Sequence, residues 1–222
     1  MTQTGIDPPN SGGKGPPEAM GTATVDRLLA VGRRLFAEGG FDGTSIRSLT
    51  AEAGANLGAV TYHFDTKEGL YQAVLASVFG PVREGIVKLA RSPLPASDRL
   101  ELFVRVMFHH QKEHQDLPRF MAQEIVLGEH PSQEVLETVK TVVGALSRIM
   151  EDGQEEGTLV EGDPVLLALS LLSQPIYLSL MPRFLSREDL RDAELPRPRE
   201  SAESHVIALL RRAFFVRKEE SE

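Results

Sequence analysis

The sequence lacks cysteine and tryptophan altogether, and aromatic residues make up only 6% of its 222 positions. Without cysteine the chain cannot form a disulfide, which fits the reducing cytoplasm as its location. The N-terminal residues lack the apolar segment of a secretory signal peptide, and their glycines and prolines predict a disordered tail over residues 1–20. The hydrophobic fraction of 41% is sufficient for a packed core.

Acidic side chains outnumber basic ones, and the net charge is −8 at pH 7. Such a balance argues against a protein that coats nucleic acid without specificity. The charge is unevenly distributed. Residues 21–70 hold five basic and six acidic side chains, whereas residues 71–222 hold 18 basic and 24 acidic side chains. If the nearly neutral segment binds DNA, it makes few phosphate contacts, which predicts a modest salt dependence of affinity.

The stretch from residue 40 to residue 67 contains two short helical patterns around a tight turn. Ile46, Leu49 and Ala53 are three and four positions apart, so they share one face of a first helix. Thr44 and Ser45 precede this helix, where a hydroxyl can accept a free backbone N–H. Gly54 ends it, because glycine adopts a left-handed backbone at little cost.

A second short helix follows the turn, from Asn56 as its predicted cap to Phe64. Val60 and Phe64 are four positions apart and face inward. Two helices joined by a short turn that contains glycine form the helix-turn-helix pattern, whose second helix enters the major groove of DNA.

This region resembles the DNA-binding domain of the TetR family of transcriptional regulators over roughly residues 25–74. The matching segments read LFAEGGF at 35–41, TSI at 44–46, AGAN at 53–56, YHF at 62–64 and KEGL at 67–70. Thr61 is a departure, since most members carry a tyrosine there. The sequence ANLGAVTYHF resembles that of a sub-branch of the family in which asparagine caps the second helix.

Helical spacing predicts further helices on both sides of this motif. The first runs from a Thr24 cap to Glu38, and its Arg27, Arg33 and Arg34 are either phosphate contacts or solvated charges. The fourth helix is predicted from a cap at Asp65 or Thr66 to Pro93, with a kink or break near Gly80. The fifth spans 98–114, Pro118 interrupts the pattern, and the sixth spans 120–127. The last three run from Pro131 to Glu155, from Asp163 and Pro164 to Met181, and over 202–217.

The eighth helix, starting at Asp163 and Pro164, is apolar nearly all round. A membrane span is one interpretation, but Ser170, Gln174 and Pro175 interrupt the run and the length is at the short end for a bilayer. A helix buried on two sides is favoured. The TetR resemblance implies that the eighth and last helices form a four-helix seam between the subunits of a homodimer.

The resemblance also implies the residues that touch DNA. Gly58 and Ala59 would let the backbone approach, Thr61 would contact a base edge or a thymine methyl, and Tyr62, His63 and Lys67 would contact phosphate. The full set is Thr44, Ser45, Arg47, Asn56, Leu57, Gly58, Ala59, Thr61, Tyr62, His63 and Lys67. The alternative is that Tyr62 and His63 only pack within the domain.

An effector pocket is likewise implied, between the fourth and eighth helices. Its expected lining is Met107, His110, Phe120, Met121, Glu124 and Tyr177, with Phe108, Arg119 and Gln123 as further candidates. Each apolar member fits equally a plain core position. His109, His110 and His114 suggest a metal site only if the fold supplies further ligands such as Glu124 or His130, so no metal and no cofactor is predicted.

The sequence therefore predicts an all-α protein with a tail over 1–20, a helix-turn-helix domain over 21–69 and a helical effector and dimerisation domain over 70–222. The predicted function is a ligand-responsive regulator, a repressor by family resemblance, that binds a near-palindromic operator as a dimer. Two other classes remain open. One is an enzyme with a metal at the histidine group, and the other is a helical interaction protein that no longer binds DNA.

Overall fold

The computed structural model describes residues 17–114, 116–126, 132–185 and 201–216. The described chain is built from helices, so the predicted all-α fold is confirmed. In chain order they are α1 Pro17–Gly39, α2 Ile46–Glu52, α3 Gly58–Phe64, α4 Lys67–Ala90, α5 Ala96–Glu113, α6 Leu117–Met121, the π-helix η1 Ala122–Val126, α7 Gln133–Glu155, α8 Pro164–Leu185 and α10 Ala202–Ala213.

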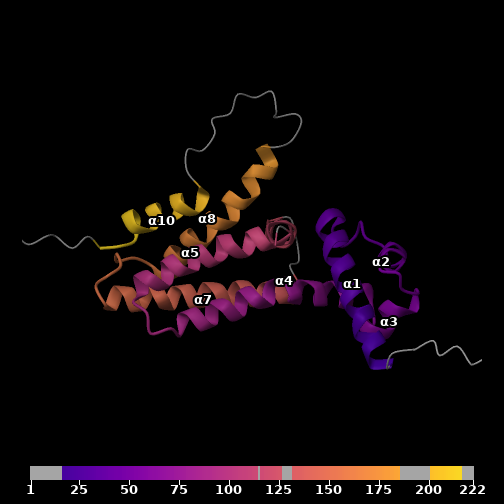
Figure 1. Cartoon of the computed structure of the whole chain (residues 1–222). Coiled ribbons are helices and arrows are strands. Elements are labelled where there is room, and N and C mark those ends of the chain that lie inside the picture. Colours follow the sequence, from indigo (N-terminus) through magenta and orange to yellow (C-terminus); the bar gives the residue numbers. More distant parts are fainter. Residues whose placement is uncertain (1–16, 115, 127–131, 186–200, 217–222) are drawn as a thin grey trace, which may run out of the picture.

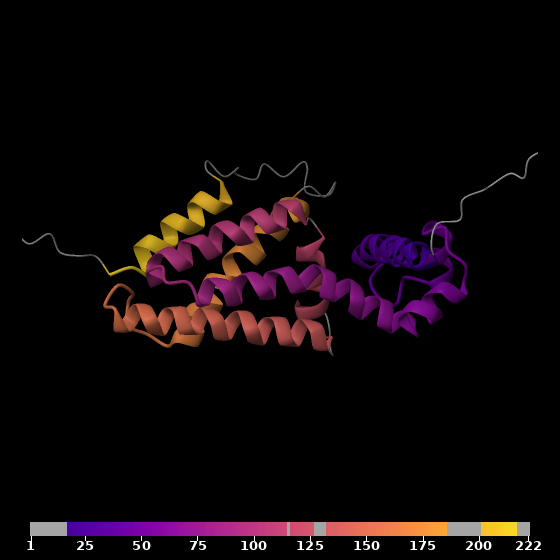
Figure 2. The ribbon, with the colours of Figure 1, turned by 60° about the horizontal axis from the view of Figure 1, so that its bottom comes forward.

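The molecule is elongated, with α1 to α3 at one end and a bundle of longer helices at the other (Figures 1 and 2). Helix α4 joins the two ends and packs against α1 at one end and α7 at the other. Its residues Leu70 and Val74 belong to a hydrophobic cluster with Leu28 and Phe36 of α1, whereas Ile86 belongs to the cluster of the bundle. A displacement of α4 within the bundle would therefore also displace the α1 to α3 group.

Local signals in the sequence set several helix starts. The Ser45 hydroxyl accepts the backbone N–H of Ser48, and the Thr66 hydroxyl accepts that of Gly69 at 3.0 Å. The carboxylate of Asp163 accepts the N–H groups of Val165 and Leu166 at 2.9 and 3.0 Å. The predicted caps at Ser45, Thr66 and Asp163 are confirmed, since each satisfies N–H groups that lack a helical partner.

Other boundaries differ from the sequence prediction. Helix α1 begins at Pro17, so Thr24 lies inside it and does not cap it; proline suits a first turn because its missing N–H is not needed there. For the same reason Pro118 is accommodated in the first turn of α6, which begins at Leu117, three residues before the predicted start. Helix α4 continues through Pro81, so the predicted break does not occur. Residues 1–16 and Pro131 lie outside the described residues.

Candidate nucleic-acid interface and effector pocket

The helix-turn-helix is held together by a small apolar core. Leu49, Ala53 and Val60 are buried in the cluster that includes Leu28. Gly54 has φ +61°, so the tight turn after α2 uses the left-handed backbone expected of a glycine there. The predicted two-helix motif is therefore present, with α3 as its second helix.

One face of α3 is open to solvent at the end of the molecule. Tyr62 is 84% exposed and Leu57 is 58% exposed, and Thr61 is exposed beside them. The Tyr62 ring packs edge-on against the ring of His63, with centroids 4.8 Å apart. Ala59 points the other way and is buried, so it belongs to the domain core and not to this open face.

The predicted cap at Asn56 is wrong. Helix α3 begins at Gly58 with Leu57 as the flanking residue, and no side chain caps it. Asn56 instead contributes its backbone carbonyl, which accepts the N–H of Ala59 at 3.0 Å. Because α3 starts one residue later than predicted, the cap position falls on Leu57 and the Asn56 side chain lies outside the helix.

Two predicted DNA contacts serve the fold in this structure. The hydroxyl of buried Thr44 donates to the carbonyl of Gly40 at 2.8 Å. The ammonium of Lys67 donates to the carbonyls of Phe41 and Thr44 at 2.9 and 3.0 Å, and lies 4.1 Å from the Phe41 ring centroid. Lys67 thus ties the loop before α2 to the start of α4. Ser45 and Arg47 are exposed on α2.

The arginines of α1 are engaged within the chain. Arg27 donates to the carbonyl of Ala53 at 3.0 Å, and Arg34 pairs with Glu38 and Glu52. The contacts with Ala53 and Glu52 join α1 to the end of α2, whereas the pair with Glu38 lies within α1, so both arginines are engaged without DNA.

Arg33 has a different role, because its partner lies beyond the domain. Its guanidinium forms a two-pronged ion pair with Asp116, just before α6, with Nη2 to Oδ1 at 2.7 Å. Burial alone would raise the pKa of Asp116, but the hydrogen bond and charge of Arg33 outweigh it and hold that pKa below its usual value. The pair is partly buried, where a bidentate contact is stronger than one in open solvent.

Two further hydrogen bonds cross the same joint. The Gln123 amide donates to the carbonyl of Ala37 at 3.3 Å, and the Tyr71 hydroxyl donates to Glu124 at 2.5 Å. Burial raises the pKa of Tyr71, and the neighbouring carboxylate of Glu124 raises it further, so the hydroxyl remains a donor. The end of α1 and the start of α4 are thereby fixed to α6 and η1.

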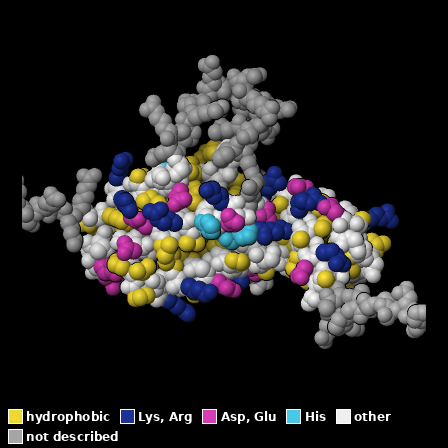
Figure 3. Space-filling model, in the orientation of Figure 1, with side chains coloured by type: hydrophobic (Ala, Val, Ile, Leu, Met, Phe, Trp, Pro, Cys, Tyr) yellow, Lys and Arg dark blue, Asp and Glu magenta, His cyan; other side chains and the backbone are white. Residues whose placement is uncertain are grey.

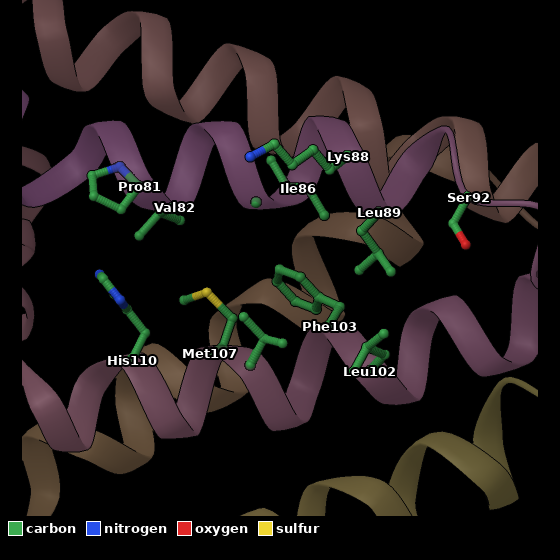
Figure 4. Close-up of a pocket in the computed structure, with 12 residues that line it drawn as sticks. Pro81, Val82, Ile86, Lys88, Leu89, Ser92, Leu102, Phe103, Met107 and His110 are labelled. Atoms are coloured by element: carbon green, nitrogen blue, oxygen red, sulfur yellow. The ribbon is translucent and has the colours of Figure 1, made fainter.

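A pocket of about 350 Å³ lies between α4 and α5 (Figure 4). Its lining is Pro81, Val82, Gly85, Ile86, Lys88, Leu89 and Ser92 with Leu102, Phe103, Val106, Met107 and His110. Met107 and His110 of the predicted set are therefore brought together here.

The other predicted pocket residues lie elsewhere. Phe120 is fully buried in the cluster shared with α1, and Met121 lines a separate small cavity of about 20 Å³. Glu124 is engaged with Tyr71, and Tyr177 is 60% exposed on α8. The α4–α5 pocket draws almost all of its lining from these two helices, and the sequence could not show that their apolar residues border a cavity.

The histidine group lies at the end of α5. The rings of His110 and His114 are 4.3 Å apart, centroid to centroid. Among the described residues, no three His, Asp or Glu side chains are grouped so that they could hold a metal ion. Burial lowers the pKa of His110, and the charges of His114, Arg33 and His109 lower it further against an opposing contact with the Val78 carbonyl.

The N-terminal and C-terminal parts of the chain match two family descriptions. Residues 28–74 match "Bacterial regulatory proteins, tetR family", and residues 97–209 match "Tetracyclin repressor-like, C-terminal domain". The chain belongs to the TetR family. It is accordingly a transcriptional regulator of that family, whose members bind DNA operators, usually as dimers that respond to small molecules.

Curated relatives of this TetR-family chain are also transcriptional regulators. It is 26% identical over 174 residues to the probable HTH-type transcriptional regulator YttP of Bacillus subtilis, covering 75% of this chain and 82% of that protein. It is 30% identical over 138 residues to the repressor AcnR of Corynebacterium glutamicum, covering 60% of this chain and 69% of AcnR.

Solved structures share the fold. SmeT, the repressor of the Stenotrophomonas maltophilia efflux pump SmeDEF, superposes with a TM-score of 0.66 at 17% identity, covering 87% of this chain and 93% of SmeT. A transcriptional regulator from Saccharomonospora viridis in complex with choline superposes with a TM-score of 0.67 at 16% identity, covering 88% of this chain and 100% of that protein. At such identities the likeness concerns the fold alone.

Proposed function

We propose that this TetR-family regulator binds a near-palindromic operator as a homodimer, with one α3 in each of two successive major grooves. Half-sites would then lie about 34 Å apart, one helical turn of DNA. The observation that carries this proposal is the open face of α3, where Thr61 and Tyr62 are exposed at the tip of the molecule. Operator binding would block transcription. The relatives are transcriptional regulators, which supports a non-enzymatic role in the bacterial cytoplasm.

The dimer would form through α8 and α10. Apolar side chains of these helices are unusually exposed: Val165 47%, Leu166 63%, Leu169 43%, Tyr177 60% and Leu209 37%. The window 164–181 of α8 has a mean hydropathy of 1.6, sufficient by length and composition for a membrane span, yet only 17% of it is buried within the chain. A second copy packed on α8 and α10 would cover this surface, as in an isologous interface.

Fluorescence anisotropy with DNA from upstream of the protein's own gene, at two salt concentrations, tests operator binding. Nanomolar binding that resists competitor DNA supports the proposal. Weak binding that modest salt abolishes, on this DNA and on neighbouring promoters, would reject it in favour of a helical interaction protein.

Tyr62→Ala is expected to weaken operator binding about tenfold or more. The side chain projects from α3 into solvent, so its loss removes a DNA contact and leaves the domain core intact. Anisotropy measures the affinity and thermal unfolding checks the fold. Tyr62→Phe serves as the matched variant, since it removes only the hydroxyl. An unchanged affinity in Tyr62→Ala would exclude this residue from the interface.

Effector release would act through the joint between α1 and α6. Asp116→Asn is expected to reduce the effect of the effector on operator affinity severalfold, because it weakens the Arg33 contact that links the two ends. A double-mutant cycle with Arg33→Gln measures the coupling, for which we expect at least about 1 kcal/mol. Additive effects of the two substitutions would mean that the pair does not transmit the signal.

A further inference from the structure

The α4–α5 pocket combines an apolar surface with one isolated polar atom. Nε2 of His110 is buried and has no hydrogen-bond partner within the described residues. A buried polar atom without a partner is unfavourable, so a ligand that supplies the partner gains affinity. His110 lies at the end of the pocket marked by Pro81, and Ser92 lies at the opposite end (Figure 4).

The dimensions of the pocket limit the length and volume of its ligand. Pro81 and Leu89 are eight residues apart on α4, a separation of about 12 Å along a helix. On α5, Leu102 and His110 are also eight residues apart, and they line the same groove. An apolar cavity of about 150 Å³ accepts one benzene ring. The volume of about 350 Å³ therefore suits a two-ring molecule or a hydrocarbon chain of similar volume.

The charge of the lining residues indicates which charge the ligand carries. Its polar members are His110, Lys88 and Ser92, and none of the lining residues is Asp or Glu. Arg33 of α1, itself paired with Asp116, and the imidazoles of His114 and His109 lie near enough to His110 to lower its pKa, so they oppose a further positive charge there. On the surface shown in Figure 3, histidines gather between an apolar patch and basic side chains. This setting disfavours a cationic ligand and favours an anionic one.

We propose that the α4–α5 pocket binds a small amphipathic carboxylate, whose apolar body lies along α4 and α5 and whose carboxylate accepts a hydrogen bond from His110. This inference rests on the proposed ligand-responsive function; it assigns the effector site to this pocket and names the ligand class. Val82, Ile86 and Met107 would contact the apolar body. Ser92, at the other end, would lie beside the tail. Lys88, whose side chain extends back toward the middle of the pocket in Figure 4, would lie along the apolar body.

The test is calorimetric titration of the full-length protein, free of DNA, with decanoate, decanol and decylamine. These probes share one apolar body and differ in the head group. Decanoate is expected to bind at least tenfold more tightly than decanol, and decylamine more weakly than either. Equal affinity for decanoate and decanol, or a preference for decylamine, would overturn the proposal.

Variants locate the head group. His110→Leu is expected to lower decanoate affinity at least tenfold and decanol affinity less than threefold, whereas Lys88→Met should change both less than threefold. His110→Gln, which keeps a polar side chain, guards against a folding defect in the leucine variant. If Lys88→Met and not His110→Leu removes the preference for decanoate, the head group binds at Lys88 and the proposed orientation is wrong.

Protonation supplies an independent readout. The carboxylate would stabilise the charged imidazole, so binding should take up protons near neutral pH and tighten as the pH falls from about 8 to about 6. The titratable and charged groups around His110 are His109 and His114 of α5 and Arg33 of α1, which is paired with Asp116, and α4 presents the Val78 carbonyl. A pH-independent affinity, or one unchanged in His110→Leu, would overturn the proposal.

The two proposals fail separately. Failure to bind decanoate in a protein that still binds its operator would reject the ligand class alone. Decanoate binding that depends on His110 in a protein without operator binding would support the pocket and reject the proposed function.

Discussion

Leu166→Asp is expected to convert the dimer to a monomer and to lower operator affinity by about 100-fold or more. In an isologous interface the substitution occurs twice, and each buried, unpaired carboxylate costs about 3–5 kcal/mol. Leu166 is 63% exposed in the single chain, so the change should leave the subunit folded. Light scattering measures the mass, and anisotropy measures affinity for the complete operator. A monomer binds only one half-site. In the dimer, binding of the second half-site is intramolecular and raises the affinity for the complete operator.

Leu136→Asp is the matched control for this substitution. Leu136 is 53% exposed on α7, outside the proposed seam, so the same chemical change should leave mass and operator affinity unaltered. A Leu166→Asp protein that remains a dimer would remove α8 from the interface. Monomers from both variants would indicate a general defect and would equally contradict the assignment.

Gly69→Ala is expected to disrupt the junction between α3 and α4 and to lower operator affinity at least tenfold. A Cβ at position 69 would lie 2.0 Å from the carbonyl oxygen of Phe64, the last residue of α3. Because that atom is backbone, relief requires a shift of α3 against α4, and overpacking of this kind costs about 1–3 kcal/mol or more. Anisotropy measures the affinity, and thermal unfolding should show a lower midpoint.

Gly144→Ala is the control for this second substitution. Gly144 lies inside α7, and an added Cβ would meet nothing within 4 Å. Alanine is favoured over glycine in a helix interior by about 1 kcal/mol, so this variant should be as stable as the parent or more so. If Gly69→Ala unfolded at the same temperature as the parent and bound the operator equally well, the junction would be more adaptable than the structure indicates.

The sequence by itself determined the features that depend on neighbouring residues. The hydroxyls of Ser45 and Thr66 and the carboxylate of Asp163 stand next to the N–H groups that they accept, so each helix start was readable from a few positions. Gly54 likewise marked the turn of the DNA-binding motif. Asn56 shows the limit of such signals, since a shift of one residue moved the cap position of α3 to Leu57.

Only the tertiary structure decided which distant residues meet. Arg33 and Asp116 are 83 positions apart, and nothing in either local pattern identifies them as partners. Val82 and Ile86 of α4 have the spacing of core residues and pack in or against the core of the bundle, yet they also line the pocket between Pro81–Leu89 and Leu102–His110. Helical periodicity shows that a side chain is apolar and which neighbours share its face. Whether that face meets a packed core, a pocket or a second chain depends on how the helices are placed in space.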